Sequence, residues 1–75
     1  MIEMVKLIVE RWVRQKDEIT GEEVEVIAEE VEVGSEKEAK EKVEELKTKE
    51  GTVRITLHYC RHDERKPCER VELWS

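Results

Sequence analysis

The chain has 75 residues, of which 37% are apolar and 45% are charged, and its formal net charge is −6. We expect one domain over residues 1–75 with a thin core, because a chain of this length buries only about 63% of the surface that it exposes when unfolded. The negative charge argues against nucleic acid and anionic membranes as partners. No apolar run can cross a bilayer and no signal peptide is recognised, so we expect a soluble protein of undetermined location.

The stretch from residue 2 to residue 14 is the most apolar part of the chain and predicts a long central strand. Its first apolar residues alternate with other side chains and share one face: Val5, Leu7 and Val9. Glu10 and Arg11 then place two polar residues in succession before Trp12, which is apolar again. One extra residue at Glu10–Arg11, a β-bulge, would return Trp12 to the apolar face.

Residues 22–33 predict a second strand with the same kind of interruption. Apolar residues alternate on either side of the Glu29–Glu30 doublet: Val24, Val26 and Ala28 before it, then Val31 and Val33. A second bulge at this doublet would bend the sheet together with the first, whereas the alternative is that both doublets are polar pairs tolerated on the surface. Asp17 and Gly21 are turn formers and predict a short hairpin loop between the two strands.

A single helix is predicted after Gly34. Ser35 and Glu38 have the spacing of a capping box, in which the two side chains bond free backbone N–H groups at the start of a helix. A narrow apolar stripe follows at helical spacing: Ala39, Val43 and Leu46. Gly51 suits the position just after a helix, where the backbone turns left-handed, so we expect the helix to stop there.

Two further strands are predicted at residues 52–62 and about 67–74, joined by a tight loop at 63–66. In the first, apolar and polar residues occupy opposite faces: Val53, Ile55, Leu57 and Tyr59, against Arg54, Thr56, His58, Cys60 and His62. In the second, the two faces hold Val71 and Leu73, against Cys68, Arg70, Glu72 and Trp74. Packing the apolar faces together predicts two cross-strand pairs: Val71 with Leu57, and Leu73 with Ile55.

These elements predict an α+β fold of order β-β-α-β-β, with a four-stranded antiparallel sheet, a long bulged hairpin and one helix packed on one face. Charge-rich strands and strands that begin with Pro are typical of sheet edges, which puts the Glu-rich second strand and the Pro67 strand at the two edges. The predicted strand order is therefore 2-1-3-4, and 1-2-3-4 and 1-2-4-3 are the alternatives.

Cys60 and Cys68 form the first candidate site. If Val71 faces Leu57, the same register puts Cys68 opposite Cys60, and directly opposed cysteines in an antiparallel pair can be bridged. A cross-strand disulfide is therefore predicted. Its nine-residue ring would stabilise the fold by about 2.6 kcal/mol in the chain-entropy model. Free thiols at an exposed sheet position are the alternative.

A metal site is a further alternative for the same cysteines. His58, Cys60, His62 and Cys68 are all zinc-type ligands. The Cα atoms of His58 and His62 are expected roughly 13 Å apart on the strand, too far for all four residues to share one ion. A site of Cys60, His62 and Cys68 is geometrically feasible but incomplete, and its spacing matches no standard zinc motif. Solvated histidines are the simpler interpretation, so no metal and no cofactor is expected.

No constellation of residues indicates catalysis, so we do not expect an enzyme. Cys60 and His62 could supply a thiol and a base, but a strand face beside a short hairpin offers no evident pocket or oxyanion donor. The glutamates of the second strand would suit a basic partner, although they are more typical of an edge strand protected against pairing. Ile8, Ile27 and Trp74 are predicted on the face away from the helix, where they either form a homodimer contact or lie singly exposed.

The segment GSEKEAKEKVEELKTKEG, residues 34–51, resembles the capped, glutamate- and lysine-filled helices of computationally designed proteins. Together with the alternating strands and their doublets, it resembles a de novo α+β mini-protein with a curved antiparallel sheet. The resemblance is one of style, is best over residues 22–57 and is weaker in HYCRHDERKPC. A hyperthermophile protein would share the narrow residue alphabet.

The resemblance implies a structural scaffold made to test a fold, with no natural biochemical activity and with no partner required. Together with the predicted cysteine pair, it gives a scaffold stapled by the Cys60–Cys68 disulfide. Two alternatives follow from the residues themselves. One is a protein–protein interaction module that uses the helix-free sheet face or an edge strand, and the other is a small metal-binding protein.

Overall fold

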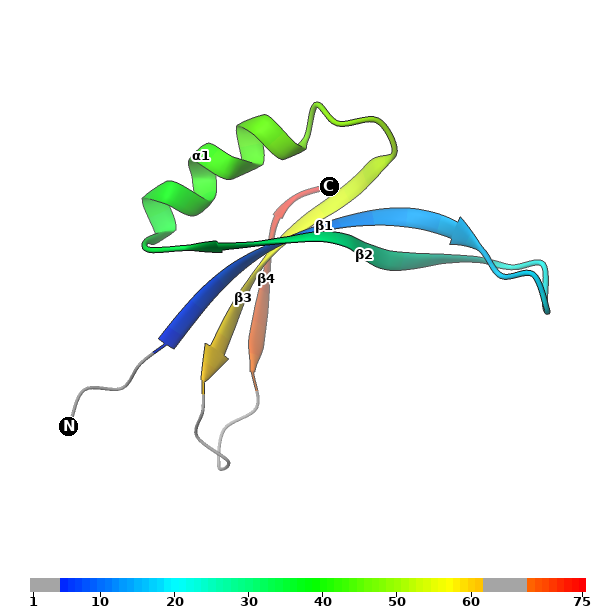
Figure 1. The fold of residues 1–75 in the computed structure, drawn as a ribbon, viewed down its shortest axis with the longest axis horizontal. Coiled ribbons are helices and arrows are strands. Elements are labelled where there is room, and N and C mark those ends of the chain that lie inside the picture. The colour runs from blue at the N-terminus through cyan, green and yellow to red at the C-terminus, as the bar shows by residue number, and fades with distance from the viewer. Residues whose placement is uncertain (1–4, 62–67) are drawn as a thin grey trace.

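The computed structural model describes residues 5–61 and 68–75. Within them, the chain forms four strands and one helix in this order: β1 (Val5–Lys16), β2 (Glu23–Val33), α1 (Glu36–Leu46), β3 (Thr52–Arg61) and β4 (Glu69–Trp74). The strands pair antiparallel in the order β2-β1-β3-β4, and α1 lies across one face of the sheet (Figure 1). The predicted α+β fold and strand order are confirmed.

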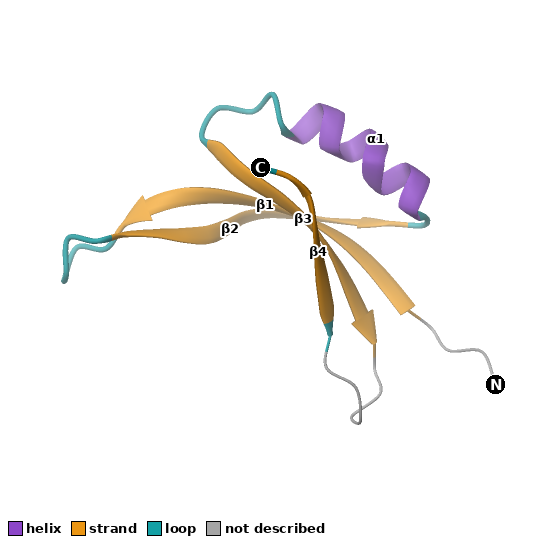
Figure 2. Cartoon of the chain, turned by 180° about the vertical axis from the view of Figure 1, so that it is seen from behind, coloured by secondary structure: helices purple, strands orange, loops and turns teal. Residues whose placement is uncertain are grey.

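The strand bounds differ slightly from the predicted ones. β1 continues to Lys16, two residues beyond the predicted end at Arg14. Its predicted start at residue 2 lies outside the described residues, as do Pro67, His62 and the 63–66 loop. The β1–β2 hairpin extends as a long arm beyond the helix, which a view from behind also shows (Figure 2). The helix therefore covers only part of the sheet.

The hydrophobic core lies between α1 and the sheet. Its buried residues come from the helix and from β1, β2 and β3: Val9, Val33, Ala39, Val43, Leu46, Ile55 and Leu57. The capping box is present, because the Glu38 amide donates to Ser35 Oγ at 3.2 Å and the Gly34 amide donates to the Glu38 carboxylate at 2.8 Å. The predicted end of the helix was wrong. It stops at Leu46, and Gly51, with φ of 87°, instead shapes the turn into β3.

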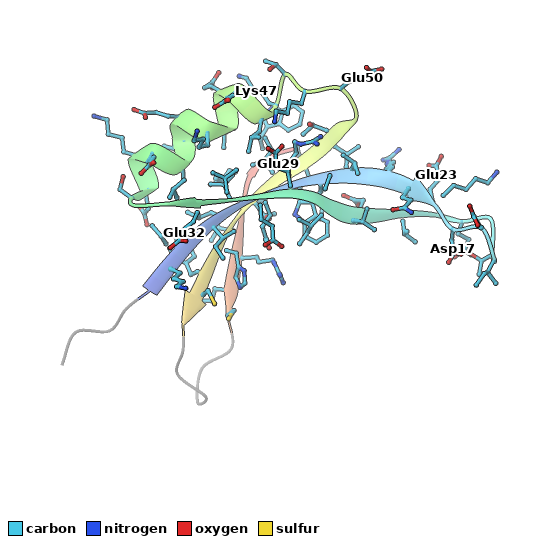
Figure 3. The ribbon with its side chains drawn as sticks, viewed as in Figure 1. Asp17, Glu23, Glu29, Glu32, Lys47 and Glu50 are labelled. Carbon is cyan, nitrogen blue, oxygen red and sulfur yellow. The ribbon has the colours of Figure 1, made fainter. Side chains whose placement is uncertain are left out.

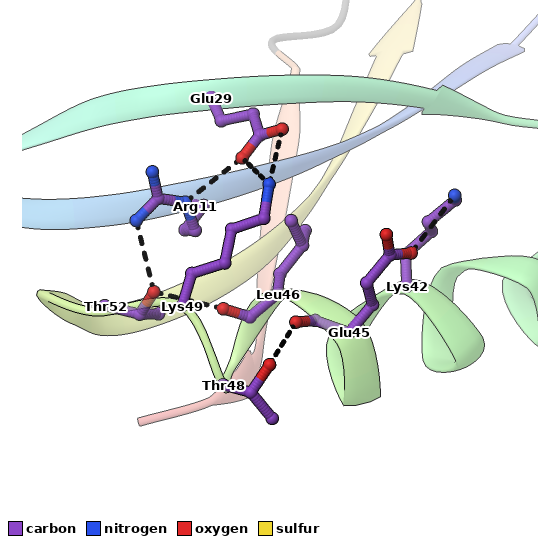
Figure 4. Close-up of polar contacts among 8 residues, drawn as sticks. All are labelled: Arg11, Glu29, Lys42, Glu45, Leu46, Thr48, Lys49 and Thr52. Carbon is purple, nitrogen blue, oxygen red and sulfur yellow. Dashed lines mark hydrogen bonds and ion pairs between the residues drawn. The ribbon is translucent and has the colours of Figure 1, made fainter.

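An ion-pair cluster fastens the end of the helix to the sheet (Figure 4). The Glu29 carboxylate lies 2.8 Å from Lys49 Nζ and 3.2 Å from Arg11 Nε. Arg11 Nη1 also donates to Thr52 Oγ1 at 3.2 Å, and Thr52 donates in turn to the Leu46 carbonyl at 3.1 Å. The hydrogen bond from Lys49 is the main reason that the pKa of Glu29 lies below its usual value, and Arg11 adds to this effect.

β1 is bent by bulges in the two strands beside it. Arg11 pairs with Glu29 and the next residue, Trp12, pairs with Ile27, so Ala28 is an extra residue in β2. On the other side, Trp12 pairs with Arg54 and Val13 pairs with Thr52, so Val53 is an extra residue in β3. The bulge predicted in the second strand is thus present, one residue before the Glu29–Glu30 doublet.

The bulge predicted in β1 at Glu10–Arg11 was wrong. Residues of β1 continue to alternate through this point, which leaves Glu10 and Trp12 together on the face away from the helix, here called the open face. The physical reason is that a bent pair of strands needs only one of them to carry the extra residue. Trp12 is also accommodated on the open face, because its indole N–H donates to Thr56 Oγ1 at 2.8 Å.

The β3–β4 hairpin has the predicted register at its centre and a different one at its end. Val71 pairs with Leu57 as predicted, but Ile55 pairs with Trp74 and leaves Leu73 as an extra residue. Trp74 packs against the core under the helix. The prediction that Trp74 lies on the open face was therefore wrong. That prediction assumed strict alternation along the strand, which does not include the extra residue Leu73.

β2 forms one edge of the sheet, as its charge pattern predicted. Figure 3 shows the side chains of Glu23, Glu29 and Glu32 spaced along it, with Asp17 in the hairpin loop. Repeated carboxylates on an edge strand discourage pairing with a further strand. Among the described residues, no helix combines the length and the apolar character needed to cross a membrane.

Candidate thiol and metal site on the open face

The open face of the central strands carries a cluster of polar side chains. Alternation along each strand and the observed register bring these residues together: Glu10 and Trp12 of β1, Thr56, His58 and Cys60 of β3, Arg70 of β4, and Cys68 just before β4. The register puts them on the side of the sheet opposite α1, where the described part of the chain adds no second backbone layer. They bury one another instead.

Glu10 is the centre of this cluster and is only 1% exposed. Its Oε1 accepts hydrogen bonds from Thr56 Oγ1 at 3.0 Å and from Arg70 Nε at 2.9 Å, and Arg70 Nη2 lies 3.4 Å from Oε2. A buried carboxylate is stable only when it is paired and hydrogen-bonded, and both conditions are met here. The hydrogen bond to Glu10 is also the main cause that raises the pKa of Arg70.

Thr56 links this carboxylate to Trp12. The threonine hydroxyl accepts from the indole N–H and donates to Glu10, so its hydrogen-bonding capacity is used in both directions. Thr56 is itself buried. Because each group orients the next, the three side chains form a fixed chain on the open face.

His58 lies beside the carboxylate and between two neighbouring strands. It pairs with Ile8 on β1 and with Arg70 on β4, and its side chain is 15% exposed. His58 Nδ1 lies 3.6 Å from Glu10 Oε2, within ion-pair range but longer than a hydrogen bond. A small rotation of the imidazole would bring Nδ1 into hydrogen-bonding distance of this oxygen, whose other donor among the described residues is Arg70 Nη2 at 3.4 Å.

Cys60 and Cys68 lie side by side at the open end of the same cluster. The two thiols are 4.1 Å apart and are not bonded, so the predicted disulfide is not present in the structure. The last printed pair of the hairpin is Tyr59 with Glu69, and continuing this register by one residue puts Cys60 opposite Cys68, as predicted. Cys60 is half-buried and Cys68 is exposed. Burial, followed by the contact with Cys68, raises the pKa of the Cys60 thiol, and the positive charge of Lys6 partly opposes this shift.

His58, Cys60 and Cys68 together form a candidate metal site. One potential ligand atom from each of them lies within 4.8 Å of the other two. The sequence hypothesis combined the cysteines with His62 instead, and His62 lies outside the described residues. Cα spacing along the strand excluded His58 and His62 from sharing one ion, and the hypothesis kept His62, but this spacing says little about where side chains on one face converge. The useful signal was the register, because it puts His58 next to both cysteines.

Comparison with known proteins gives no match of any of the three kinds sought: no protein-family model, no curated protein and no solved structure matches the chain.

Proposed function

We propose that this chain is a non-enzymatic structural scaffold of designed type, whose C-terminal hairpin is closed by a disulfide between Cys60 and Cys68. The observation that supports the proposal best is the placement of the two thiols, 4.1 Å apart across the β3–β4 pair. An S–S bond is about 2.05 Å long, so the sulfur atoms must approach by about 2 Å. Rotation about the side-chain bonds of exposed Cys68 supplies a movement of this size.

Disulfide formation needs an oxidant, and a small disulfide such as oxidised glutathione is sufficient. The thiolate of exposed Cys68 attacks one of its sulfur atoms, forms a mixed disulfide and releases one glutathione thiol. Cys60 then loses its proton, attacks the sulfur of Cys68 and displaces the second glutathione. The two cysteines lose two protons and two electrons, and the small disulfide is reduced to two thiols.

The bridge would act on a short edge strand. β4 has six residues and forms an edge of the sheet, and Val71 in its middle is 46% exposed. Closing the hairpin reduces the freedom of the unfolded chain and thereby favours the paired state of β4. Small scaffolds with a thin core often need such a covalent staple, which agrees with the proposed function.

Support for a designed origin comes from how closely the local signals agree with the fold. The helix begins at a capping box, and both glycines with positive φ, Gly21 and Gly51, lie in turns. Agreement between local propensity, caps and turns is the criterion that idealised designs are built to satisfy. The bulges in β2 and β3 curve the sheet in the way that designed curved sheets require.

The disulfide is tested by intact mass and thermal unfolding. Oxidised glutathione is expected to lower the monomer mass by two hydrogens and to raise Tm by about 10–20 °C, which the loop-entropy term gives for a domain of this size. The matched control is the Cys60→Ser, Cys68→Ser double variant, whose mass and Tm should not respond to the oxidant. Thiols that stay fully alkylatable, or bridges formed only between two chains, would refute the staple.

A protein–protein interaction module is the second candidate function, and one observation favours it. Ile8 and Ile27 are on the open face, where they are half-buried, and Trp12 stands beside Ile27 across the β1–β2 pair. We expect Ile8→Glu with Ile27→Glu to abolish any homodimer detected by size-exclusion chromatography with light scattering. A monomer at the highest attainable concentration excludes the homodimer version.

A further inference from the structure

We propose that the reduced protein binds one zinc ion through His58, Cys60 and Cys68, and that Glu10 orients the imidazole for this purpose. This site goes beyond the scaffold function, since it needs the thiols free. It also differs from the set that the sequence suggested, because His58 replaces His62.

The two sulfur atoms need little movement to accept the ion. In a tetrahedral site with Zn–S bonds of about 2.3 Å, two thiolate sulfur atoms lie roughly 3.7 Å apart. The thiols of Cys60 and Cys68 are 4.1 Å apart, and the ligand atoms of all three residues lie within 4.8 Å of one another. The sulfur atoms therefore move by about 0.4 Å to bind zinc but by about 2 Å to form a disulfide.

Glu10 supplies the outer contact that a zinc-bound histidine needs. Metal-binding histidines almost always donate their second ring N–H to a carboxylate or carbonyl, which fixes the tautomer and the ring orientation. Glu10 Oε2 lies 3.6 Å from His58 Nδ1, while Oε1 is already used by Thr56 and Arg70. If the proton is on Nδ1, this nitrogen donates to the buried oxygen, and the lone pair on Nε2 is left for the metal.

The charges around the site are compatible with a divalent cation. Two thiolates bring two negative charges that Zn²⁺ neutralises. The charge of Glu10 is offset by Arg70, which donates two hydrogen bonds to it. The carboxylate therefore remains an orienting group and does not compete as a metal ligand. Two sulfur ligands and one imidazole favour zinc over magnesium or calcium, which prefer oxygen.

One coordination position remains for water or an added ligand. His58 and Cys60 are half-buried and Cys68 is exposed, so the site borders on solvent at its cysteine end. Three protein ligands with an open fourth position define an accessible zinc site, in contrast to the closed four-ligand sites that only support structure. The chemistry available there is binding of a small anionic or thiol ligand to the metal.

Titration of the fully reduced protein with Co²⁺, followed by displacement with Zn²⁺, tests the proposal. We expect one equivalent of Co²⁺ per chain, with intense visible bands of tetrahedral cobalt and a sulfur-to-cobalt charge-transfer band in the near ultraviolet. One equivalent of zinc should remove both and raise Tm. No stoichiometric binding in the reduced protein, or an octahedral cobalt spectrum without charge transfer, overturns the site.

Two ligand variants define the coordination set. Cys68→Ser changes an exposed side chain, so it should fold like the parent, and it should lose most of the charge-transfer band and most of the affinity. His58→Gln should keep the charge-transfer band but bind much more weakly. Undiminished binding in either variant removes that residue from the site. The disulfide experiment uses oxidised protein and this one uses reduced protein, so the two proposals can fail separately.

Glu10→Gln tests whether Glu10 positions His58, and the same substitution at a second carboxylate is the control. Glu30→Gln is the control, because Glu30 is opposite Glu10 on the same face but is exposed. The loss of zinc affinity expected for Glu10→Gln is about 10–100-fold, with no loss for the control. If Glu10→Gln does not fold, ¹⁵N NMR of the parent decides the matter. Zinc bound at Nε2 with a proton on Nδ1 supports the role of Glu10, and the opposite tautomer refutes it.

Discussion

Val9 and Glu10 are neighbours on β1, face opposite sides of the sheet and are equally inaccessible, at 0% and 1% exposure. Val9 is covered by the helix and belongs to an apolar core shared with residues such as Ile55 and Leu57. Among the described residues, Glu10 is covered by side chains on its own sheet, chiefly Thr56 and Arg70. One face is thus buried by a second layer of backbone and the other by a local polar cluster.

The two kinds of burial depend on different physical terms. The helix-covered face stabilises the fold by removing apolar area from water, and this contribution tolerates small displacements of the side chains. The polar cluster gains only if each buried group keeps its partner, because an orphaned carboxylate or hydroxyl loses its solvation without compensation. On the helix-covered face, we therefore expect a substitution to lower the free energy of unfolding in proportion to the side-chain volume removed. On the open face, we expect the loss to depend on which hydrogen-bonding partner remains.

The largest effect is expected on the helix-covered face. Ile55→Ala removes a fully buried side chain and leaves a cavity, so the free energy of unfolding should fall by about 3–4 kcal/mol in urea or thermal denaturation. Val71→Ala is the matched control, because Val71 is on the same face of the neighbouring β3–β4 pair but is 46% exposed, and it should cost less than about 1 kcal/mol. Similar losses in both variants would mean that the helix does not bury this face.

The second effect concerns the partner dependence of the open face. Arg70→Met leaves the carboxylate of Glu10 with Thr56 as its one donor at hydrogen-bonding distance among the described residues, and we expect the free energy of unfolding to fall by about 1–2 kcal/mol. The loss is smaller than for a wholly buried pair, because the Arg70 side chain is 49% exposed and water screens the charges.

A double-mutant cycle checks this partner dependence. Combining Arg70→Met with Glu10→Gln should cost less than the sum of the two single variants, because the second change removes the uncompensated charge. Strict additivity would show that Glu10 and Arg70 are not energetically coupled.

A third experiment separates the two faces by local unfolding. Ser35→Ala removes the hydrogen bond to the Glu38 amide at the start of α1, and we expect a loss of about 1 kcal/mol. Amide hydrogen exchange should become faster in α1 before it does so at the central strand residues of the open face. Equal acceleration in both regions would show that the two faces open together.

The smallest effect is expected in acid. Contacts with Lys49 and Arg11 lower the pKa of Glu29 in the folded chain, so this group stabilises the fold above its unfolded pKa, and the stabilisation is lost as pH falls through the folded pKa. Glu29→Gln should therefore flatten the acid limb of the stability curve slightly, and less so in high salt. Glu32→Gln on the same strand is the control, and an equal change there would rule out a specific role for Glu29.

The helix-covered face could be predicted from sequence because its information is periodic. Alternation at Val9 and Ile55 and the helical stripe ending at Leu46 identified nearly the whole core, and charge placed β2 at an edge. The bulges were harder to place. A doublet marks where the phase of the apolar pattern breaks, but the extra residue can belong to either paired strand, and here it is Ala28 or Val53 rather than a residue of β1.

The open face was harder to predict because its information lies in pairs of residues far apart in the chain. Glu10 and Arg70 are separated by 60 positions, and nothing in the pattern around either residue signals the other. Once the register is known, the meeting of Glu10, Thr56 and His58 follows from it. Cα spacing alone did not select His58, since it does not include the direction in which side chains lean.

The chain of hydrogen bonds from Trp12 through Thr56 to Glu10 also gives the protein an internal optical probe. The chain contains two tryptophans, and Trp74 packs against the core on the other side of the sheet. Replacing Trp74 with Phe would leave a single indole whose N–H is bonded to the network that touches His58. Its emission would then follow events at the cysteine end of the open face without any attached label.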